Sequence, residues 1–420
     1  MQIYIVKSGD SLYSIAKMFK ISLHILMEIN GLEKPNDLVV GQAILILEPE
    51  IIHTIQPNET LEYISQKYNT SINKLYRNNP SLSARPFLIP GDDLIISYTN
   101  NPTSSILVNG FVYPNISREL LTTTLPYLTY ISPFTYSFSA YGDLKPLRDD
   151  FILRRSMEYN VLPLMTLSPI DDDGKFVSEL TEKLLNNNNA QEKLISQILT
   201  TIQNKKYSGI ILNFEQIPIQ SRNLYISLIQ NMQKLLNENG YTLYIALDPN
   251  NMVDANQYYT ALGEFSNGII IMTYGIEITQ TSSITISSIQ KIEDIIKYIT
   301  SLIPANKVIL GIPNHGYGWR TMQNNNNMPQ PRIIGNQEAI QIAISQNAAI
   351  MFDEKSQYPY FYYYINNQRF EVWFQDARSA IAKFNLIKKY NLAGISYWTL
   401  MKKSHQTWQA LNATFEIKQK

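Results

Sequence analysis

One carboxylate in this chain stands where acid–base chemistry could use it. Glu215 closes the run Tyr207–Glu215, YSGIILNFE, whose β-branched and leucine residues are typical of a strand buried on both faces of a parallel sheet. In barrels of parallel strands, side chains at the carboxyl ends face the active site. A carboxylate there is poorly solvated, which suits a group that gives or takes a proton. The alternative is a strand that simply ends at a solvated Glu.

Eight apolar runs of this kind follow the first hundred residues, and helical patterns such as Arg222–Asn239 and Ser379–Tyr390 fill the gaps between them. This alternation over roughly 300 residues is typical of a TIM barrel. The sequence therefore predicts an α/β fold, a (β/α)8 barrel over residues 106–420. The eight runs are ILVNGFVY, YLTYISPFTYSFS, VLPLMTLS, YSGIILNFE, YTLYIALDP, GIIIMTYG, KVILGIPNHGYGW and GISYWTL.

Extra material separates the seventh and eighth runs, at about residues 333–374. It contains the tyrosine-rich stretch YPYFYYYINNQRFEVWF, in which the polar turn Asn366-Asn367-Gln368 divides two aromatic runs. Such a turn between strand-like runs predicts a hairpin. We expect a small α+β insertion beside the barrel mouth.

Composition excludes several classes of function. The 420 residues suffice for two or three domains, and 35 Lys+Arg balance 35 Asp+Glu, which argues against nucleic acid or an acidic membrane surface as partner. The absence of Cys excludes thiol chemistry, and four His without metal-type spacing predict no metal site. We expect no cofactor, and a monomer. The 28 Tyr, with many Asn, suit a sugar ligand.

The first hundred residues contain an internal repeat of about 45 to 50 residues. We place the copies at residues 1–48 and 50–98, with a short polar linker at 99–105. Each copy reads as strand, helix, helix, strand, and Ser11 or Thr60 stands where a helix N-cap is expected. The amino terminus is strand-like and lacks the pattern of a cleavable signal peptide, and no stretch is long enough for a membrane span.

This strand–helix–helix–strand pattern, with G-D-S-L near its start and G-Q-x-I-x-I at its end, resembles the LysM domain. The first copy fits closely, whereas the second has Pro57-Asn58-Glu59-Thr60 in place of the usual glycine and Asp. The resemblance implies binding to N-acetylglucosamine chains of peptidoglycan or chitin, in a groove between two loops. Those loops contain Gly9, Asp10, Ser11, Leu12, Asn30, Gly31 and Leu32 in the first copy, and Asn58, Thr60 and Leu61 in the second. The alternative is that both copies are merely packing units.

The strand ends of the barrel resemble glycoside hydrolase family 18, and most closely its Bacillus-type spore cortex-lytic N-acetylglucosaminidases, which carry paired LysM domains ahead of the barrel. The matching motifs are FEQIPIQSRNLY, IMTY, VILGIPNHGYGW, VWFQDARS and GISYW. The resemblance implies a general acid at Glu215 and substrate-assisted catalysis, in which the N-acetyl oxygen of the sugar attacks its own anomeric carbon.

This chain departs from the family motif D-x-x-D-x-D-x-E, because Ser208, Ile211 and Asn213 replace the three Asp and only Glu215 remains. The last of those Asp orients the acetamide in the family and stabilises its developing charge, which Asn213 can do only by hydrogen bonding. The M-T-Y-D motif of the sixth strand also loses its carboxylate, at Gly275, but keeps Tyr274, whose hydroxyl supports the acetamide in the family.

Other residues have weaker assignments. Trp398 matches the aromatic floor of the subsite for the reacting sugar, and Tyr317 and Trp319 are candidates for stacking on neighbouring sugars. Asp248 at the end of the fifth strand is a candidate for a compensating charge in the substrate site, and Glu277 is a second. For both acids, a solvated loop position is the alternative.

Two interpretations of the whole chain follow. In the first, it is a glycosidase that cleaves N-acetylglucosaminyl bonds in peptidoglycan of the spore cortex during germination, with activity reduced by the missing Asp residues. In the second, it is a non-catalytic, lectin-like binder on a degenerate barrel. A structural coat component tethered by LysM is a third possibility. The resemblance implies that the protein is made in the mother cell and assembles on the spore coat or cortex, without a cleavable signal peptide.

Overall fold

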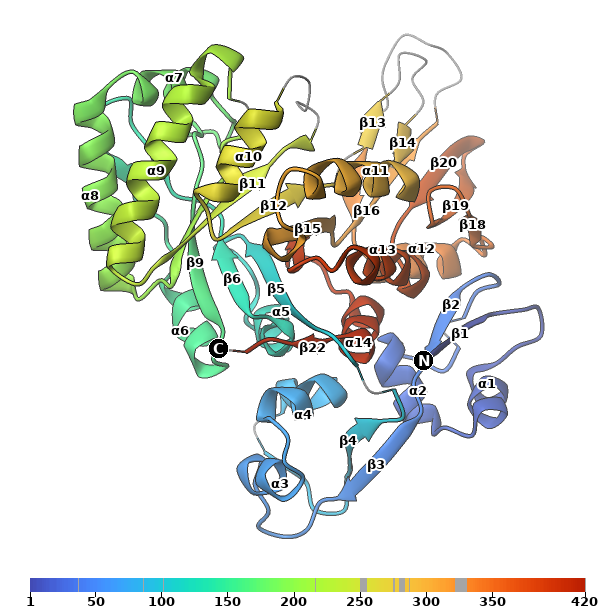
Figure 1. The fold of residues 1–420 in the computed structure, drawn as a ribbon. Helices are drawn as coiled ribbons and strands as arrows, with labels where there is room; N and C mark the ends of the chain where they lie inside the picture. The colour runs from blue at the N-terminus through green and yellow to red at the C-terminus, as the bar shows by residue number, and fades with distance from the viewer. Residues whose placement is uncertain are drawn as a thin grey trace.

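The chain builds a barrel of parallel strands with two small repeats below it and a second sheet at its side, in the view of Figure 1. The computed structural model describes all residues except 37, 86, 101, 216, 250–254, 275, 279–283, 287, 322–330 and 420.

The barrel contains eight strands, each parallel to its neighbours. Their order is β5-β6-β9-β10-β11-β12-β15-β21, and the pairing of β21 with β5 closes the sheet. Every predicted run contains one of these strands, so the predicted TIM barrel is confirmed. The strands are β5 (Ser105–Val112), β6 (Tyr130–Pro133), β9 (Leu162–Leu167), β10 (Gly209–Leu212), β11 (Thr242–Leu247), β12 (Gly268–Met272), β15 (Val308–Pro313) and β21 (Gly394–Trp398).

Amphipathic helices cover the outside of the barrel (Figure 1). In α11 the buried residues are Ile292, Ile295, Ile296 and Ile299, a spacing that puts one apolar stripe against the strands. The covering helices are α5 (Arg118–Thr124), α6 (Asp150–Glu158), α7 (Ser178–Leu185), α8 (Asn188–Lys205), α9 (Arg222–Glu238), α10 (Asn256–Glu264), α11 (Ile289–Thr300), α13 (Ala377–Tyr390) and α14 (His405–Thr414).

The insertion begins earlier than predicted. The run expected as the seventh strand is divided, because β15 ends at Pro313 and Gly316–Arg320 forms a strand of a separate antiparallel sheet. Gly316 permits this, since a Cβ there would lie 2.3 Å from the carbonyl oxygen of Trp373 on the neighbouring strand. The insertion contains β16 (Gly316–Arg320), β17 (Arg332–Ile334), α12 (Asn336–Ser345), β18 (Met351–Asp353), β19 (Tyr358–Ile365) and β20 (Gln368–Trp373).

The predicted hairpin of the insertion is present. Strands β19 and β20 are joined by Asn366 and Asn367, whose φ angles are +49° and +60°. Two consecutive left-handed residues are the requirement of a type I′ turn, and Asn tolerates that conformation better than most residues.

The two repeats share one βααβ design. Ser11 caps α1 by accepting the amide of Ser14 at 3.1 Å, and Thr60 caps α3 by accepting that of Tyr63 at 3.2 Å, as the sequence predicts. The first repeat comprises β1 (Gln2–Ile5), α1 (Leu12–Phe19), α2 (Leu23–Asn30) and β2 (Ala43–Ile46). The second comprises β3 (Pro49–Thr54), α3 (Leu61–Lys67), α4 (Ile72–Asn78) and β4 (Asp93–Tyr98).

Helix α14 lies between the barrel and both repeats, and every residue from Gln406 to Thr414 is buried. Its polar side chains at intervals of three reach the repeats: Gln406 donates to Asn30, Gln409 donates to the carbonyl oxygen of Arg77, and Asn412 donates to Asn78. The chain then ends in β22 (Glu416–Ile417), which pairs with the start of β5, while Glu416 forms an ion pair with Lys74 of α4 at 2.5 Å.

Candidate active site

Glu215 lies on the inner side of the barrel, just past the end of β10. Side chains alternate along a strand, and Ile211 belongs to the packed cluster inside the barrel, so Asn213 and Glu215 share its direction. Asp248 follows Tyr244 and Ala246 of the same inner cluster in the same way on β11. The remaining members of this cluster are Phe111, Tyr130, Phe134, Leu164, Ile270 and Ile309, with Leu107, Leu162, Met272, Ala393 and Trp398 at its edge.

The register brings the two acids to one level of the barrel. Leu212 of β10 pairs with Ile245 of β11, so Glu215 and Asp248 each stand three residues beyond a matched pair on neighbouring strands. Burial, and secondly the negative charge of Asp248, raise the pKa of Glu215 from 4.5 to about 7. Glu215 therefore holds a proton at mildly acidic pH, as a general acid must.

An aromatic wall stands beside the two acids. Trp398, at the end of β21, is half-buried, and its ring stacks on that of Tyr274 with centroids 5.6 Å apart and an interplanar angle of 6°. The rings of Phe134 and Tyr113 meet Trp398 edge-on at 4.8 and 6.2 Å. Gly311 makes room for this wall, because a Cβ there would lie 2.9 Å from the Tyr274 ring.

Tyr113 and Phe134 are two residues of this wall that the sequence motifs do not indicate. The negative charge of Glu215 contributes, after burial, to raising the pKa of Tyr113, which places the two side chains in the same site. The sequence did contain one signal for Tyr113. Side chains alternate along a strand, and Tyr113 stands two residues after Phe111, which points into the barrel from its first strand.

Two buried polar atoms of the site have no hydrogen-bond partner among the described residues. They are the hydroxyl of Tyr274 and Oδ1 of Asn213. The amide nitrogen of Asn213 donates to the hydroxyl oxygen of Ser168 at 3.3 Å, which fixes the side chain. Buried polar atoms are nearly always bonded in proteins, so these two are placed to receive a polar ligand.

The missing acids of the family motif are replaced in different ways. Ile211 packs inside the barrel, and Ser208 donates its backbone amide to Pro163 at 2.8 Å. The barrel interior below Glu215 is thus closed by apolar packing. Gly275, where the sixth strand lacks its carboxylate, lies outside the described residues.

Trp319, predicted to stack on a sugar, is 7% exposed and lies within the sheet of the insertion. Tyr317, two residues earlier on β16, is partly buried, and its hydroxyl lies 3.0 Å from the imidazole of His315. Burial lowers the pKa of that imidazole to about 4, so it is neutral at neutral pH.

The residues predicted to bind glycan in the first repeat serve its own structure. Asp10 accepts from the Tyr4 hydroxyl at 2.8 Å and from the Lys7 amide at 2.7 Å. Leu12 and Leu32 belong to the core of the repeat, and Ser11 caps α1. Gly9 is exposed.

Asn30 and Gly31, predicted to bind glycan, lie against other parts of the chain: Asn30 is buried and Gly31 is half-buried. The Asn30 amide donates to the carbonyl oxygens of Leu26 and Leu45, and its oxygen accepts from the Leu45 amide and from Gln406. Gly31 packs against His405, which a Cβ would approach within 2.8 Å.

The second repeat presents its predicted residues differently. Asn58 and Thr60 are exposed and Leu61 is half-buried. Beside them lies a groove of about 320 Å³, which is lined by Glu59, Thr60, Leu61, Glu62, Tyr76, Leu82, Arg85, Phe87 and Leu88.

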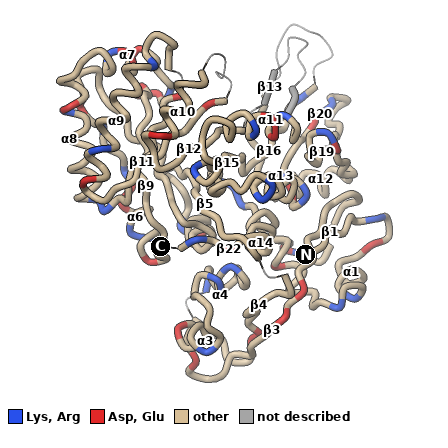
Figure 2. Tube along the Cα trace, in the orientation of Figure 1, with Lys and Arg blue, Asp and Glu red and all other residues tan. Residues whose placement is uncertain are grey.

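Both signs of charge are interspersed over the helices and repeats (Figure 2). Within the described part of the chain, no three His, Asp or Glu side chains gather as a metal would need. In that same part, no helix has the length and apolar character to cross a membrane.

Known proteins share this architecture. The sequence model for the glycosyl hydrolases of family 18 matches residues 174–402, and that for the LysM domain matches residues 4–46 and 53–97. The cortical fragment-lytic enzyme of Bacillus subtilis (strain 168) is 32% identical over 437 residues, which cover 100% of this chain and 99% of that protein. The crystal structures of the spore cortex-lytic enzyme SleL from Bacillus megaterium QM B1551 and from Bacillus cereus each give a TM-score of 0.81, at 30% and 29% identity, over 100% of this chain and 99% of theirs.

Proposed function

Because this chain belongs to the glycosyl hydrolases of family 18, we propose that it cleaves N-acetylglucosaminyl bonds in peptidoglycan fragments of the spore cortex, with retention of configuration and with the substrate's own acetamide as nucleophile. The observation that carries this proposal is the raised pKa of Glu215, about 7, at the inner end of β10.

The residues divide the reaction among them. Glu215 gives its proton to the glycosidic oxygen as the bond to the anomeric carbon breaks, while the acetamide oxygen attacks that carbon and forms a cyclic oxazolinium ion. Glu215, now ionised, takes a proton from water as water opens the ring. Tyr274 and Asn213 hold the acetamide with the two polar atoms that have no partner among the described residues. Trp398 supports the sugar ring from below.

The positive charge on the oxazolinium ion is the weak point of this site. A carboxylate at position 213 would stabilise it directly, whereas Asn213 supplies only a neutral hydrogen bond. Losing a charge-assisted contact of about 1.5–3 kcal/mol costs on the order of tenfold to a hundredfold in rate. Asp248 is the charge that offsets part of this loss, because it lies at the level of Glu215 on the next strand.

A lectin-like protein is the second candidate, and the amide at position 213 is the observation that favours it. Retention of a proton donor with a raised pKa, beside an aromatic platform, favours the enzyme. A protein that only binds glycan has no use for a carboxyl group that changes its charge near neutral pH.

The test is the release of reducing ends from purified cortex fragments by the full chain and by Glu215→Gln. We expect release by the unmodified protein, and its loss by at least a thousandfold in the variant, which keeps the shape of the site but holds no transferable proton. Glu192→Gln, the same exchange at an exposed position of α8, is the matched control and should leave the rate unchanged. If both forms bind the fragments but neither releases reducing ends, the hydrolase proposal is refuted and the lectin-like function remains.

The LysM domains tether the enzyme to its polymeric substrate in this proposal. Their ligand is the N-acetylglucosamine chain of peptidoglycan, and their attachment to the barrel keeps the active site near the polymer. We propose the spore as the place of action, since the similar SleL proteins are spore cortex-lytic enzymes, and a monomer as the working unit.

A further inference from the structure

The two LysM repeats contain one equivalent loop, between their second helix and their last strand. The amide of Gly41 bonds the carbonyl oxygen of Val6 at 2.9 Å, and that of Gly91 bonds Ile55 at 2.8 Å. These bonds make Gly41 and Gly91 equivalent positions of the two loops, so Val39 of the first repeat corresponds to Ile89 of the second. We call residues 31–42 the docked loop and residues 80–92 the open loop, because their surroundings differ.

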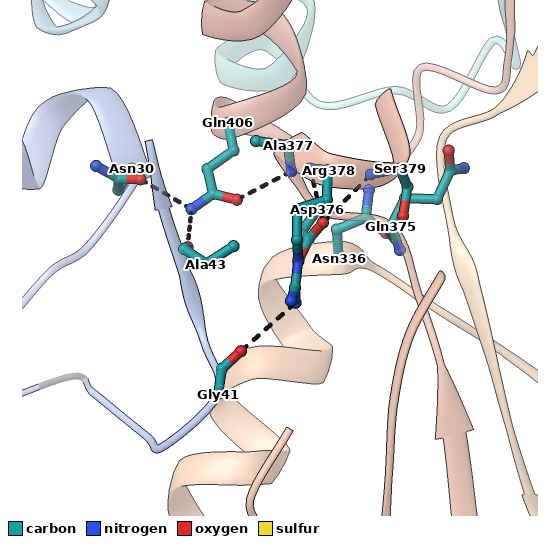
Figure 3. Close-up of polar contacts among 10 residues, drawn as sticks. All are labelled: Asn30, Gly41, Ala43, Asn336, Gln375, Asp376, Ala377, Arg378, Ser379 and Gln406. Atoms are coloured by element: carbon teal, nitrogen blue, oxygen red, sulfur yellow. Dashed lines mark hydrogen bonds and ion pairs between the residues drawn. The ribbon is translucent and has the colours of Figure 1, made fainter. Parts of the chain in front are cut away.

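The docked loop begins against the barrel. Gln406 of α14 donates from its amide nitrogen to Asn30 at 2.8 Å and to the carbonyl oxygen of Ala43 at 2.7 Å (Figure 3). Gln337 of α12 donates to the carbonyl oxygen of Gly31. The polar groups at this end of the loop are therefore bonded to the barrel and its insertion.

The other end of the docked loop enters the insertion. The carbonyl oxygen of Val40 accepts the amide of Ile350 at 2.9 Å. Arg378 donates to the carbonyl oxygen of Gly41 at 3.5 Å (Figure 3). Val39 is 8% exposed and belongs to the apolar core of the insertion, with Ile340 and Phe361. The equivalent residue of the open loop, Ile89, is 41% exposed.

The second repeat is attached by its helix α4 instead. Arg77 donates to Asn412 at 2.9 Å and to the carbonyl oxygen of Pro126 at 3.0 Å, and Asn73 donates to that of Tyr159 at 2.7 Å. This attachment leaves the groove and the later part of the open loop exposed, whereas Pro80–Ala84 at its start contact α5 and α2, and the Ser81 amide donates to Glu28 at 2.7 Å. Phe87 at the groove is 65% exposed.

We infer that the two repeats have different roles: the first is a docking module whose loop between α2 and β2 is held at both ends by the barrel and its insertion, and the second alone holds the N-acetylglucosamine chain. This inference rests on the proposed glycan function and specifies which repeat performs it. Paired modules usually gain avidity because two linked sites bind one polymer. Here that gain is absent, because only the second repeat binds glycan and the first attaches it to the barrel.

The chemistry of the groove suits an N-acetylated sugar. Phe87, Leu61 and Leu88 supply apolar faces for the ring and the acetyl methyl group, and the ion pair of Arg85 with Asp92, at 2.6 Å, lies at its edge with polar atoms. In the first repeat, Tyr13 takes the place of Glu62, which lines the groove of the second. Tyr13 would touch a sugar if the first repeat also bound one.

Tyr13 and Phe87 form a matched pair for the test, since they are 66% and 65% exposed. Titration calorimetry with the hexamer of N-acetylglucosamine is done on the full chain carrying Glu215→Gln and Trp398→Ala, which removes cleavage and the sugar platform of the barrel. We expect Phe87→Ala to weaken binding at least tenfold and Tyr13→Ala to change it less than twofold. Circular dichroism checks that both variants stay folded.

Equal losses from Tyr13→Ala and Phe87→Ala would overturn the inference, since both repeats would then bind. No loss from either variant would overturn it too, because the groove at Phe87 would not be the site. The hydrolase proposal is judged separately, by reducing ends released by the unmodified chain. The unmodified chain could release reducing ends while the chain carrying Glu215→Gln and Trp398→Ala fails to bind the hexamer. That result would refute the division of roles and leave the hydrolase proposal standing.

Discussion

Replacement of Asp248 by Asn tests whether this acid stands in for the carboxylate missing at position 213. Burial is the larger cause of the raised pKa of Glu215, about 7, and the negative charge of Asp248 is the smaller. Two charges at neighbouring strand ends interact by about 1.4 kcal/mol when the effective dielectric constant lies between those of protein and water.

The same field acts with opposite sign on the reacting sugar. A negative charge that disfavours ionised Glu215 by about 1.4 kcal/mol favours a positive charge at a comparable distance by a similar amount, which is about tenfold in rate. Asp248→Asn should therefore lower kcat about tenfold at pH 5, where Glu215 is protonated in both forms. It should also lower the pKa of Glu215, because a like charge has been removed.

The assay is kcat/KM on a soluble cortex fragment between pH 4.5 and 9. Activity needs protonated Glu215, so the alkaline limb of the unmodified enzyme falls near pH 7, and that of Asp248→Asn falls at a lower pH. Asp173→Asn, the same exchange in an exposed turn, should change neither quantity. If the pH profile of Asp248→Asn keeps both the alkaline limb and the plateau of the unmodified enzyme, Asp248 does not act on Glu215 or on the reacting sugar.

Two further predictions concern position 213 and the docked loop. Asn213→Asp restores a carboxylate beside the acetamide, so kcat should rise at least tenfold. The added negative charge should also raise the pKa of Glu215 and move the alkaline limb of the pH profile above pH 7. A slower enzyme whose alkaline limb has not moved would contradict this prediction. Gly41→Ala should lower the free energy of unfolding by about 2–4 kcal/mol in urea titrations, because its Cβ would lie 1.8 Å from the carbonyl oxygen of Ile350. Gly91→Ala is the matched control, because the φ angle of Gly91 is +93° and that of Gly41 is +84°, but Gly91 has open space around it. It should lower the free energy of unfolding by only about 1 kcal/mol. Equal decreases for the two variants would argue against docking of the first loop.

The barrel was predictable because its signals are local and repeated. Each strand is a short apolar run, and each helix carries an apolar stripe, so eight alternations leave few other folds. Glu215 and Trp398 were predictable because strand ends meet at one face. The level that Glu215 shares with Asp248 was not, since register between strands is set by tertiary packing.

The burial of predicted binding residues could not be inferred from the sequence. Trp319 and Asn30 stand in motifs where a sugar-binding role fits, but both are buried, and Asn30 is bonded by a segment distant in the chain. Nothing local in Gln406 or Arg378 announces that it reaches back more than 300 residues to the first repeat. Sequence pattern reports which side chains could face solvent, and only the assembled fold decides which of them do.

The burial of α14 between the barrel and both repeats has a consequence for synthesis. The repeats leave the ribosome before α14 does, since Gln406, Gln409 and Asn412, which complete their hydrogen bonds, lie more than 300 residues later in the chain. In that interval the nascent chain carries two repeats with uncovered attachment faces, among them Ile29 and Leu45, which later join the barrel core. Assembly of the repeats on the barrel waits for α14, so removal of this helix undoes contacts of both repeats.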